Sequence, residues 1–168
     1  SHDGTCSNVI VLSIDIVLHK LGDLANPKSV ALWQDLIDLD IIIFILAGPP
    51  CETWSVARFA ALNDQLHGPR PLRSLENLWG NCALSRAESQ QVQVGNALLR
   101  ATIQLFISAA ASKHTAAVME HPQRAHWRPE APSSWMLPEL LWLKNHVKGD
   151  AIDIDQCMVG ASSKKPTT

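Results

Sequence analysis

A short apolar run that leads into Gly-Pro-Pro-Cys constrains this chain more than any other feature. Residues 41–46 are all apolar and rich in β-branched side chains, and Gly48, Pro49 and Pro50 follow one residue later. Such a run predicts a buried strand of a parallel sheet. Because proline fixes φ and has no N–H for the ladder, the chain must leave the sheet there. Cys51 is therefore expected in the loop beyond the strand's carboxyl end, where open α/β sheets bind ligands.

The position of Cys51 favours a reactive thiol. A helix is expected to begin near Thr53 or Ser55, which would place the thiol close to a helix N-terminus. That location favours the thiolate, the form that attacks carbon. The alternative is an inert cysteine buried in a turn, and the preceding Gly-Pro-Pro weighs against it.

Composition limits the class of protein. With 168 residues and 46% hydrophobic content, the chain is expected to form one domain spanning residues 1–168. A net charge of −2 gives no global basic field, so a nucleic-acid partner would need a local patch. No apolar run reaches the roughly 18 residues of a membrane span, so no membrane partner is expected. The four cysteines have neither CxxC nor zinc-ligand spacing, which predicts reduced thiols, no metal site and an intracellular, non-secreted protein: Cys6, Cys51, Cys82 and Cys157.

The elements before Cys51 predict an α/β fold. Residues 8–16 have strand composition, and Asn26-Pro27 is typical of a helix N-cap and first-turn proline. The strand of residues 41–46 follows that helix. An order of strand, helix and strand implies a parallel pair with a right-handed crossover.

The second half of the chain continues the pattern after a long loop over residues 58–81. Ser85 and Glu88 form a capping-box pattern for a helix that runs to about Ala111 and is expected to be buried against the sheet. The elements predicted beyond it are a strand over 115–119, a helix from Ser133 or Pro138, a strand over 150–156 and a polar tail over 160–168.

Two reactive residues therefore lie just past predicted strand ends. Glu120 ends the strand of residues 115–119 as Cys51 ends that of residues 41–46. If the strands are neighbours, the thiol and the carboxyl converge on one cleft. A nucleophilic cysteine paired with an acid suits addition to an electron-poor ring or acyl centre. His121 could serve a cysteine hydrolase instead, but adjacent strand-end side chains diverge.

These motifs, taken in order, resemble the DNA (cytosine-5) methyltransferase family, in particular its phage- and virus-like branch. GPPCETWS resembles the family's nucleophile motif, and VMEHP its next catalytic strand end. SIDI followed by GDL resembles the segments that hold S-adenosylmethionine, and IDQCMVGASSKKPTT resembles the segment after the catalytic core. Glu52 and His121 depart from the family's usual Gln and Asn.

The resemblance implies a fold and a set of site residues. The fold would be the three-layer, mostly parallel, Rossmann-like sheet of S-adenosylmethionine-dependent methyltransferases. Cys51 would be the nucleophile and Glu120 the carboxyl at the target base, while Asp15, Asp23 and Pro49 would lie at the cofactor. The implied reaction is thiolate addition to carbon 6 of a flipped or single-stranded cytosine, followed by methyl transfer to carbon 5.

The long loop is expected to contact DNA. It carries Arg58, Arg70 and Arg73, and the loop after Glu120 carries Arg124. Guanidinium groups placed around a flipped base can hold phosphates. The alternative is a solvated loop with scattered charge. The implied setting is intracellular, either nuclear or associated with a virus or phage.

The family's glycine-rich cofactor turn has no counterpart in this sequence. Residues 8–16 match the family's second strand, so the resemblance implies an N-terminally incomplete fold with weak or no binding of S-adenosylmethionine. Two alternatives stay open: a cytosine methyltransferase or its catalytic fragment, and a non-catalytic remnant of that fold derived from a virus or mobile element.

Overall fold

The computed structural model describes residues 9–59, 69–155 and 166–167. Three α-helices, three short 3-10 helices and four short strands make up the described elements. In chain order they are η1 (Lys20–Gly22), α1 (Pro27–Asp38), β1 (Phe44–Ala47), η2 (Val56–Phe59), α2 (Arg86–Ala111), β2 (Ala116–Met119), η3 (Ser134–Met136), α3 (Pro138–Val147), β3 (Ile154–Asp155) and β4 (Pro166–Thr167).

A parallel pair is present, but its partners differ from the pair implied for residues 8–16 and 41–46, which does not form in the described residues. β1 and β2 are hydrogen-bonded neighbours that run in the same direction, with Phe44 opposite Ala116 and Ala47 opposite Met119. The chain between them passes through α2, as a parallel connection requires. The protein is therefore α/β with a parallel two-stranded sheet, and the condition set by the sequence analysis, that the strands before Cys51 and Glu120 be neighbours, is met.

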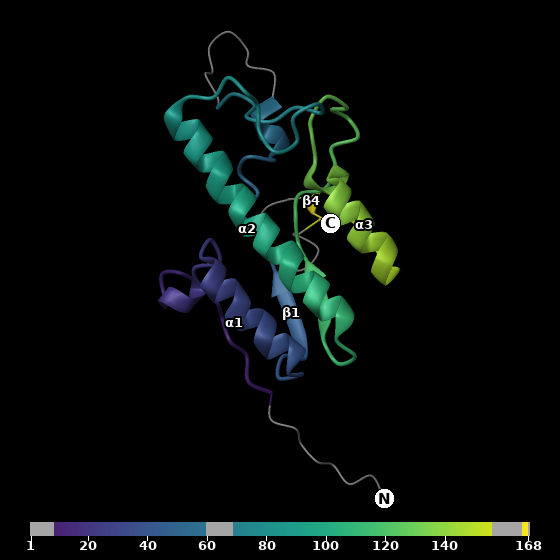
Figure 1. Ribbon diagram of the computed structural model, residues 1–168. Coiled ribbons are helices and arrows are strands. Elements are labelled where there is room, and N and C mark those ends of the chain that lie inside the picture. Colours follow the sequence, from purple (N-terminus) through teal and green to yellow (C-terminus); the bar gives the residue numbers. More distant parts are fainter. Residues whose placement is uncertain (1–8, 60–68, 156–165, 168) are drawn as a thin grey trace, which may run out of the picture.

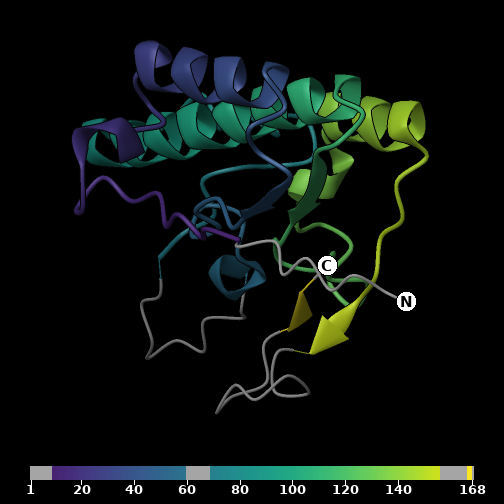
Figure 2. The same ribbon diagram turned by 90° about the horizontal axis from the view of Figure 1, so that it is seen from below.

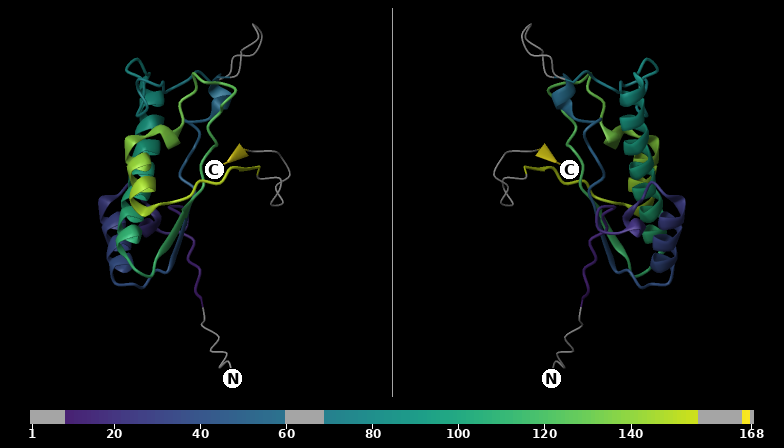
Figure 3. Two further views of the ribbon diagram at one scale, coloured as in Figure 1. Left: turned by 90° about the vertical axis from the view of Figure 1, so that its right-hand side faces the viewer. Right: turned by 90° about the vertical axis from the view of Figure 1, so that its left-hand side faces the viewer.

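All three α-helices lie on one face of this sheet (Figures 2 and 3). Inward-facing Ile45 and Ala117 pack with α1 and α2, around buried Ile37 and Leu105. A second cluster joins α2 to α3, and its buried members are Trp54, Leu99, Ile103, Leu137, Leu140 and Leu143. The core thus lies between the sheet and a single layer of helices.

The predicted burial of residues 41–46 on both faces is wrong. Burial alternates along both strands, so that Phe44, Leu46 and Val118 are exposed while their neighbours face the helices. Every residue of the apolar run favours a strand, which is why burial on both faces was predicted. Among the described residues, however, helices cover only one face of the sheet.

The predicted strand over residues 8–16 is also wrong where the structure describes it. Residues 9–15 have no regular structure, and a turn follows at 16–18. Strand propensity alone does not form a strand without a partner edge. Asp15 instead closes the turn, since its carboxylate accepts a hydrogen bond from the Val17 N–H at 2.7 Å.

The predicted helix starts are confirmed. The Asn26 side chain caps α1 by accepting from the Lys28 N–H, and Pro27 occupies the first turn. Ser85 and Glu88 form the predicted capping box at the start of α2. Both candidate starts of the last helix are used, since Ser133 caps η3 and Pro138 opens α3.

The end of the chain differs from the prediction. Of the strand expected over residues 150–156, the described part contributes only Ile154–Asp155, which pairs antiparallel with Pro166–Thr167. Pro166 and Thr167 belong to the segment that was predicted as a polar tail. Residues 156–165 lie outside the described residues, as do residues 60–68 of the long loop.

Within the described residues, α2 is the one helix long and apolar enough to cross a membrane by length and composition. The same description fits the core helix of a soluble domain. α2 contacts α1, α3 and β2 and buries residues including Leu99, Ile103 and Leu105. Its apolar character is thus accounted for by packing, although Val94 and Ile107 remain exposed, contrary to the near-complete burial expected.

Arg70 reinforces the start of α2. Its guanidinium donates to both carboxylate oxygens of Glu88 at 2.7 Å, and Glu88 also accepts from the Ser85 N–H at 2.8 Å. The Arg70 hydrogen bond, followed by that from Ser85, lowers the pKa of Glu88 from 4.5 to about 2. A carboxylate with a lowered folded-state pKa stabilises the fold above its unfolded-state pKa and loses that contribution as the pH falls.

We therefore expect Glu88→Gln to flatten the acid dependence of stability. Between pH values of about 5 and about 2 the native protein should lose the contribution of the Glu88 charge, whereas the glutamine variant has none to lose. Urea unfolding followed by circular dichroism at both ends of this range measures the difference. Glu76→Gln, in an exposed loop, should keep the native dependence, and an unchanged dependence in Glu88→Gln would contradict the assignment.

Candidate active site

The two predicted catalytic segments leave the sheet side by side. The Glu120 N–H donates to the Ala47 carbonyl at 2.8 Å, which extends the ladder by one residue beyond β2. The Glu120 carboxylate lies over Gly48, because an added Cβ there would stand 3.6 Å from Glu120 Oε2. Both the Gly-Pro-Pro-Cys loop and Glu120 are therefore at the carboxyl edge of the parallel pair, as the sequence predicted.

Cys51 is half-buried in the loop that follows. Its carbonyl accepts a hydrogen bond from the Trp54 N–H at 2.9 Å, which closes a tight turn. A helical segment begins directly after Ser55, as predicted, and over its described residues, Val56–Phe59, it is a 3-10 helix. Pro49 is buried under the loop and Pro50 is exposed.

A buried arginine holds this loop in place. Arg73 is 1% exposed, and its Nε and Nη2 atoms donate to Thr53 Oγ1 at 3.0 and 2.8 Å. Its Nη1 donates to the Leu78 carbonyl at 2.8 Å, and its guanidinium lies 4.0 Å from the centre of the Trp54 ring. Burial, and secondarily the nearby Arg58, lower the pKa of Arg73 to about 10. The guanidinium therefore fixes both residues that follow Glu52.

Trp54 links the loop to an aromatic cluster behind the sheet edge. Its ring packs edge-on against Trp79 and His121, and His121 packs in the same way against Trp135. His121 is 1% exposed, and its Nδ1 lies 2.6 Å from Ser134 Oγ. His121 therefore occupies a core position, whereas the neighbouring Glu120 is half-exposed.

Arg58 and Arg70 are also engaged within the chain. Arg58 donates to the Glu52 and Arg70 carbonyls at 2.8 and 3.0 Å, and to Gln91 Oε1 at 3.2 Å. Arg70 donates to the Ala83 carbonyl at 2.8 Å in addition to its pair with Glu88. Three of the four arginines predicted at DNA phosphates thus tie the loop to itself and to α2.

Arg124 differs from those three. It is exposed, and among the described residues its guanidinium forms no hydrogen bond or ion pair. It follows Glu120 by four residues in the loop that leaves the same sheet edge. Its charge is therefore available to a ligand near that edge.

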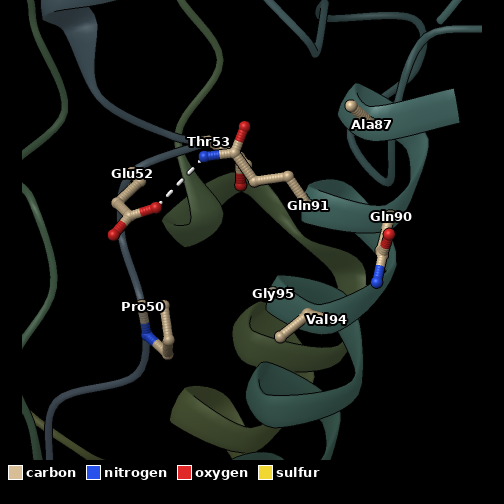
Figure 4. Close-up of a pocket in the computed structure, with 8 residues that line it drawn as sticks. All are labelled: Pro50, Glu52, Thr53, Ala87, Gln90, Gln91, Val94 and Gly95. Carbon is tan, nitrogen blue, oxygen red and sulfur yellow. Dashed lines mark hydrogen bonds between the residues drawn. The ribbon is translucent and has the colours of Figure 1, made fainter. Parts of the chain in front are cut away.

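A cavity of about 420 Å³ lies between the Cys51 loop and the first turns of α2 (Figure 4). Glu52 accepts a hydrogen bond from Gln91 Nε2 across it at 3.1 Å. The cavity is lined by Pro50, Glu52, Thr53, Ala87, Gln90, Gln91, Val94 and Gly95. Neither Cys51 nor Glu120 lines it, so it lies on the α2 side of the loop and does not hold the predicted reacting groups.

The predicted cofactor residues Asp15 and Asp23 make hydrogen bonds within their own turns. Their carboxylates accept from the N–H groups of Val17 and Ala25, at 2.7 and 3.1 Å, as turn-forming aspartates do. Asp15 is exposed and Asp23 half-exposed, while Pro49 is buried.

Sequence reasoning missed the structural role of Arg73 and Trp54. An arginine in a loop without apolar periodicity gave no sign that it would be buried. The one available signal was that two tryptophans, Trp54 and Trp79, flank Arg73 in the sequence, since guanidinium groups stack on aromatic rings. Within the described residues, no three His, Cys, Asp or Glu side chains are grouped to hold a metal ion.

No protein-family model, curated protein or solved structure matches the chain.

Replacing Arg73 should unfold the loop that carries Cys51. Arg73→Ala removes charged hydrogen bonds to Thr53 and Leu78 and leaves a cavity beside Trp54, so we expect a loss of about 2–4 kcal/mol in the free energy of unfolding. Arg73→Lys should show most of the same loss of stability, since one ammonium group cannot reproduce the several hydrogen bonds of the guanidinium group. Tryptophan fluorescence during urea unfolding reports the change.

Arg124→Ala is the matched control for these variants. It should change the free energy of unfolding by less than about 0.5 kcal/mol, because its guanidinium is exposed and forms no hydrogen bond or ion pair among the described residues. Equal effects of the Arg73 and Arg124 substitutions would contradict the anchoring role of Arg73.

Proposed function

We propose that this chain carries the base-activating part of a DNA (cytosine-5) methyltransferase-like protein. The observation that supports the proposal is the parallel pairing of β1 and β2, which brings Glu120 over Gly48, three residues before Cys51. In a three-layer Rossmann-like fold of the methyltransferase type, these two strands would form part of a larger sheet. Cys51 is the nucleophile and Glu120 the acid in this proposal.

The chemistry assigned to these residues is addition of a thiol to cytosine. The Cys51 thiolate forms a bond to carbon 6, and the electron pair of the carbon 5–carbon 6 double bond moves into the ring to give a nucleophilic enamine. Protonated Glu120 donates to ring N3, where it stabilises the charge that addition creates. Elimination of the thiolate reverses the step and regenerates both groups.

The substrate class follows from the same chemistry. Carbon 6 is not accessible within a stacked duplex, so the target is a flipped or single-stranded cytosine in DNA. Among the four predicted phosphate-binding arginines, we assign direct contact to Arg124, because it is exposed at the correct sheet edge. Arg58, Arg70 and Arg73 act by positioning the loop, since their guanidinium groups are bonded within the chain.

The hydrogen bonds of Asp15 and Asp23, the residues predicted at the cofactor, favour a second function. In the family, S-adenosylmethionine supplies the methyl group, but Asp15 and Asp23 are used here by their own turns. We therefore derive no step through the cofactor in this chain. A non-catalytic remnant of the methyltransferase fold, able to bind nucleic acid without modifying it, accounts for this feature.

Covalent capture tests the role of Cys51. We expect the chain to form an adduct with a single-stranded oligonucleotide that contains 2-pyrimidinone, a cytosine analogue without the 4-amino group, whose carbon 6 is more electrophilic. The reaction needs no cofactor, and the adduct is detected by intact-protein mass spectrometry. Cys51→Ser should abolish the adduct, and Glu120→Gln should slow its formation by about 10²-fold or more.

Cys82→Ser is the control for a generally reactive thiol, since Cys82 is also free and more exposed than Cys51. It should leave the adduct unchanged. An adduct that persists in Cys51→Ser would overturn the nucleophile assignment, and no adduct in the native chain would favour the non-catalytic remnant.

We also expect S-adenosylmethionine to bind this chain weakly or not at all. The described residues around Asp15, Asp23 and Pro49 do not enclose a ligand, so little of the cofactor surface would be removed from water. Calorimetric titration of the purified chain measures the affinity directly. Micromolar binding, about −8 kcal/mol, would show that a complete cofactor pocket forms.

A further inference from the structure

One tryptophan of this chain is held out of the core. Trp127 is 65% exposed, the highest value among the six tryptophans, and Trp142 follows at 52%. Trp142 already stacks on His146 of the same helix, with 4.8 Å between the ring centres and 13° between the ring planes. Trp127 has no ring partner among the described residues. Because tryptophan is strongly buried on average, a free and exposed indole needs a physical explanation.

The backbone fixes Trp127 in this position. The Arg128 N–H donates to the Ala125 carbonyl at 3.0 Å, which closes a tight turn with His126 and Trp127 at its tip. Ala125 itself is buried and anchors the turn to the protein. A second turn follows directly, since the Ala131 N–H donates to the Arg128 carbonyl at 3.0 Å. The exposed indole is therefore presented by an ordered part of the chain.

The turn belongs to the segment that leaves the sheet after Glu120. Figures 1 and 3 show that the connections after β1 and β2 leave the sheet at the same end. His121, the next residue, packs edge-on against Trp54 of the Cys51 loop, with 6.3 Å between the ring centres. The segment that carries Trp127 is thus tied at its start to the loop that carries the proposed nucleophile.

The charges near Trp127 select the kind of ligand. Arg124 is exposed and forms no hydrogen bond or ion pair among the described residues, whereas Arg128 pairs with Glu130 at 3.2 Å. A free guanidinium three residues from an exposed indole suits a ligand with both an anionic group and a planar ring. A nucleotide of a single strand has both, because its phosphate can meet the arginine and its base can stack on the indole. In a duplex, neighbouring bases already cover these faces.

Two other partners fit this turn less well. An acidic peptide could meet Arg124, but it need not supply a planar ring for Trp127. A lipid surface would accept the indole, but the other exposed side chains at the tips of the two turns are His126, Pro129 and Glu130. Little apolar area would therefore enter a bilayer.

We propose that Trp127 stacks on an unpaired base of the DNA strand that carries the target cytosine, while Arg124 contacts a phosphate of the same strand. The ligand class rests on the proposed function, but the stacking contact needs neither the Cys51 thiol nor S-adenosylmethionine. A base turned out of a duplex leaves its neighbour with an uncovered face, and an indole on this segment replaces the lost stacking.

Binding of single-stranded oligonucleotides to the full chain tests this proposal. In a Cys51→Ser background, which removes covalent capture, fluorescence anisotropy measures the dissociation constant for a labelled strand of about 12 nucleotides. Trp127→Ala should raise that constant about 10-fold or more, and Trp127→Phe should restore most of the affinity, because a phenyl ring also stacks. Arg124→Ala should weaken binding and reduce its dependence on salt concentration.

A strand of the same length without bases separates stacking from charge. Trp127→Ala should leave the affinity for this strand unchanged, whereas Arg124→Ala should lower it. Trp142→Ala is the matched control, since Trp142 is also exposed but already stacks on His146. It should bind both strands as the Cys51→Ser chain does.

Four results would overturn the stacking contact. They are unchanged affinity of Trp127→Ala for the natural strand, an equal loss in Trp142→Ala, an equal loss of Trp127→Ala on the strand without bases, and a Cys51→Ser chain that binds neither strand. Binding to phosphatidylglycerol vesicles in place of the strand would assign the turn to lipid and also overturn it. A chain that forms no Cys51 adduct but loses strand affinity in Trp127→Ala would refute the proposed chemistry and keep this inference.

Discussion

The parallel pairing of β1 and β2 is the constraint on which the rest of the structure depends. Parallel neighbours cannot be joined by a tight turn, so the chain must cross the sheet and return. α2 is that return, and it becomes the central helix against which α1 and α3 pack. The same geometry places both strand ends at one edge. The position of the Glu120 carboxylate over Gly48, three residues before Cys51, is therefore a consequence of strand direction.

Guanidinium groups organise the edge that this pairing creates. Arg73, Arg58 and Arg70 make directional hydrogen bonds to carbonyl and side-chain oxygens of the Cys51 loop and the start of α2. A loop with few apolar residues cannot be fixed by burial alone, and a rigid five-donor group supplies the missing contacts. The cost is that these charges are no longer available to an external anion. Recognition of phosphate would then rest on exposed residues such as Arg124.

Among the described residues, helices cover only one face of the sheet, and this accounts for the exposure of several apolar side chains. Phe44, Leu46 and Val118 project from the other face by strand alternation.

Local sequence determined the features that depend on near neighbours. Asn26 with Pro27, and Ser85 with Glu88, specify helix starts because their hydrogen bonds span only two or three residues. Proline after residues 41–46 and at Pro122 ended both strands. The alternation of strands and helices indicated a parallel sheet with Cys51 and Glu120 just past its strand ends, although the pair it implied, residues 8–16 with 41–46, does not form in the described residues. These predictions needed no knowledge of distant contacts.

The tertiary structure decided what depends on residues far apart in sequence. Whether residues 9–14 form a strand depends on a partner edge, and propensity does not supply one. Whether Arg73 binds phosphate or anchors a loop depends on Thr53 and Trp54 meeting it across twenty residues of chain. The exposure of Phe44 likewise depends on which layers cover the sheet. Hydrogen-bond partners and burial are properties of the assembled fold, and a single sequence states only what each residue could contribute to them.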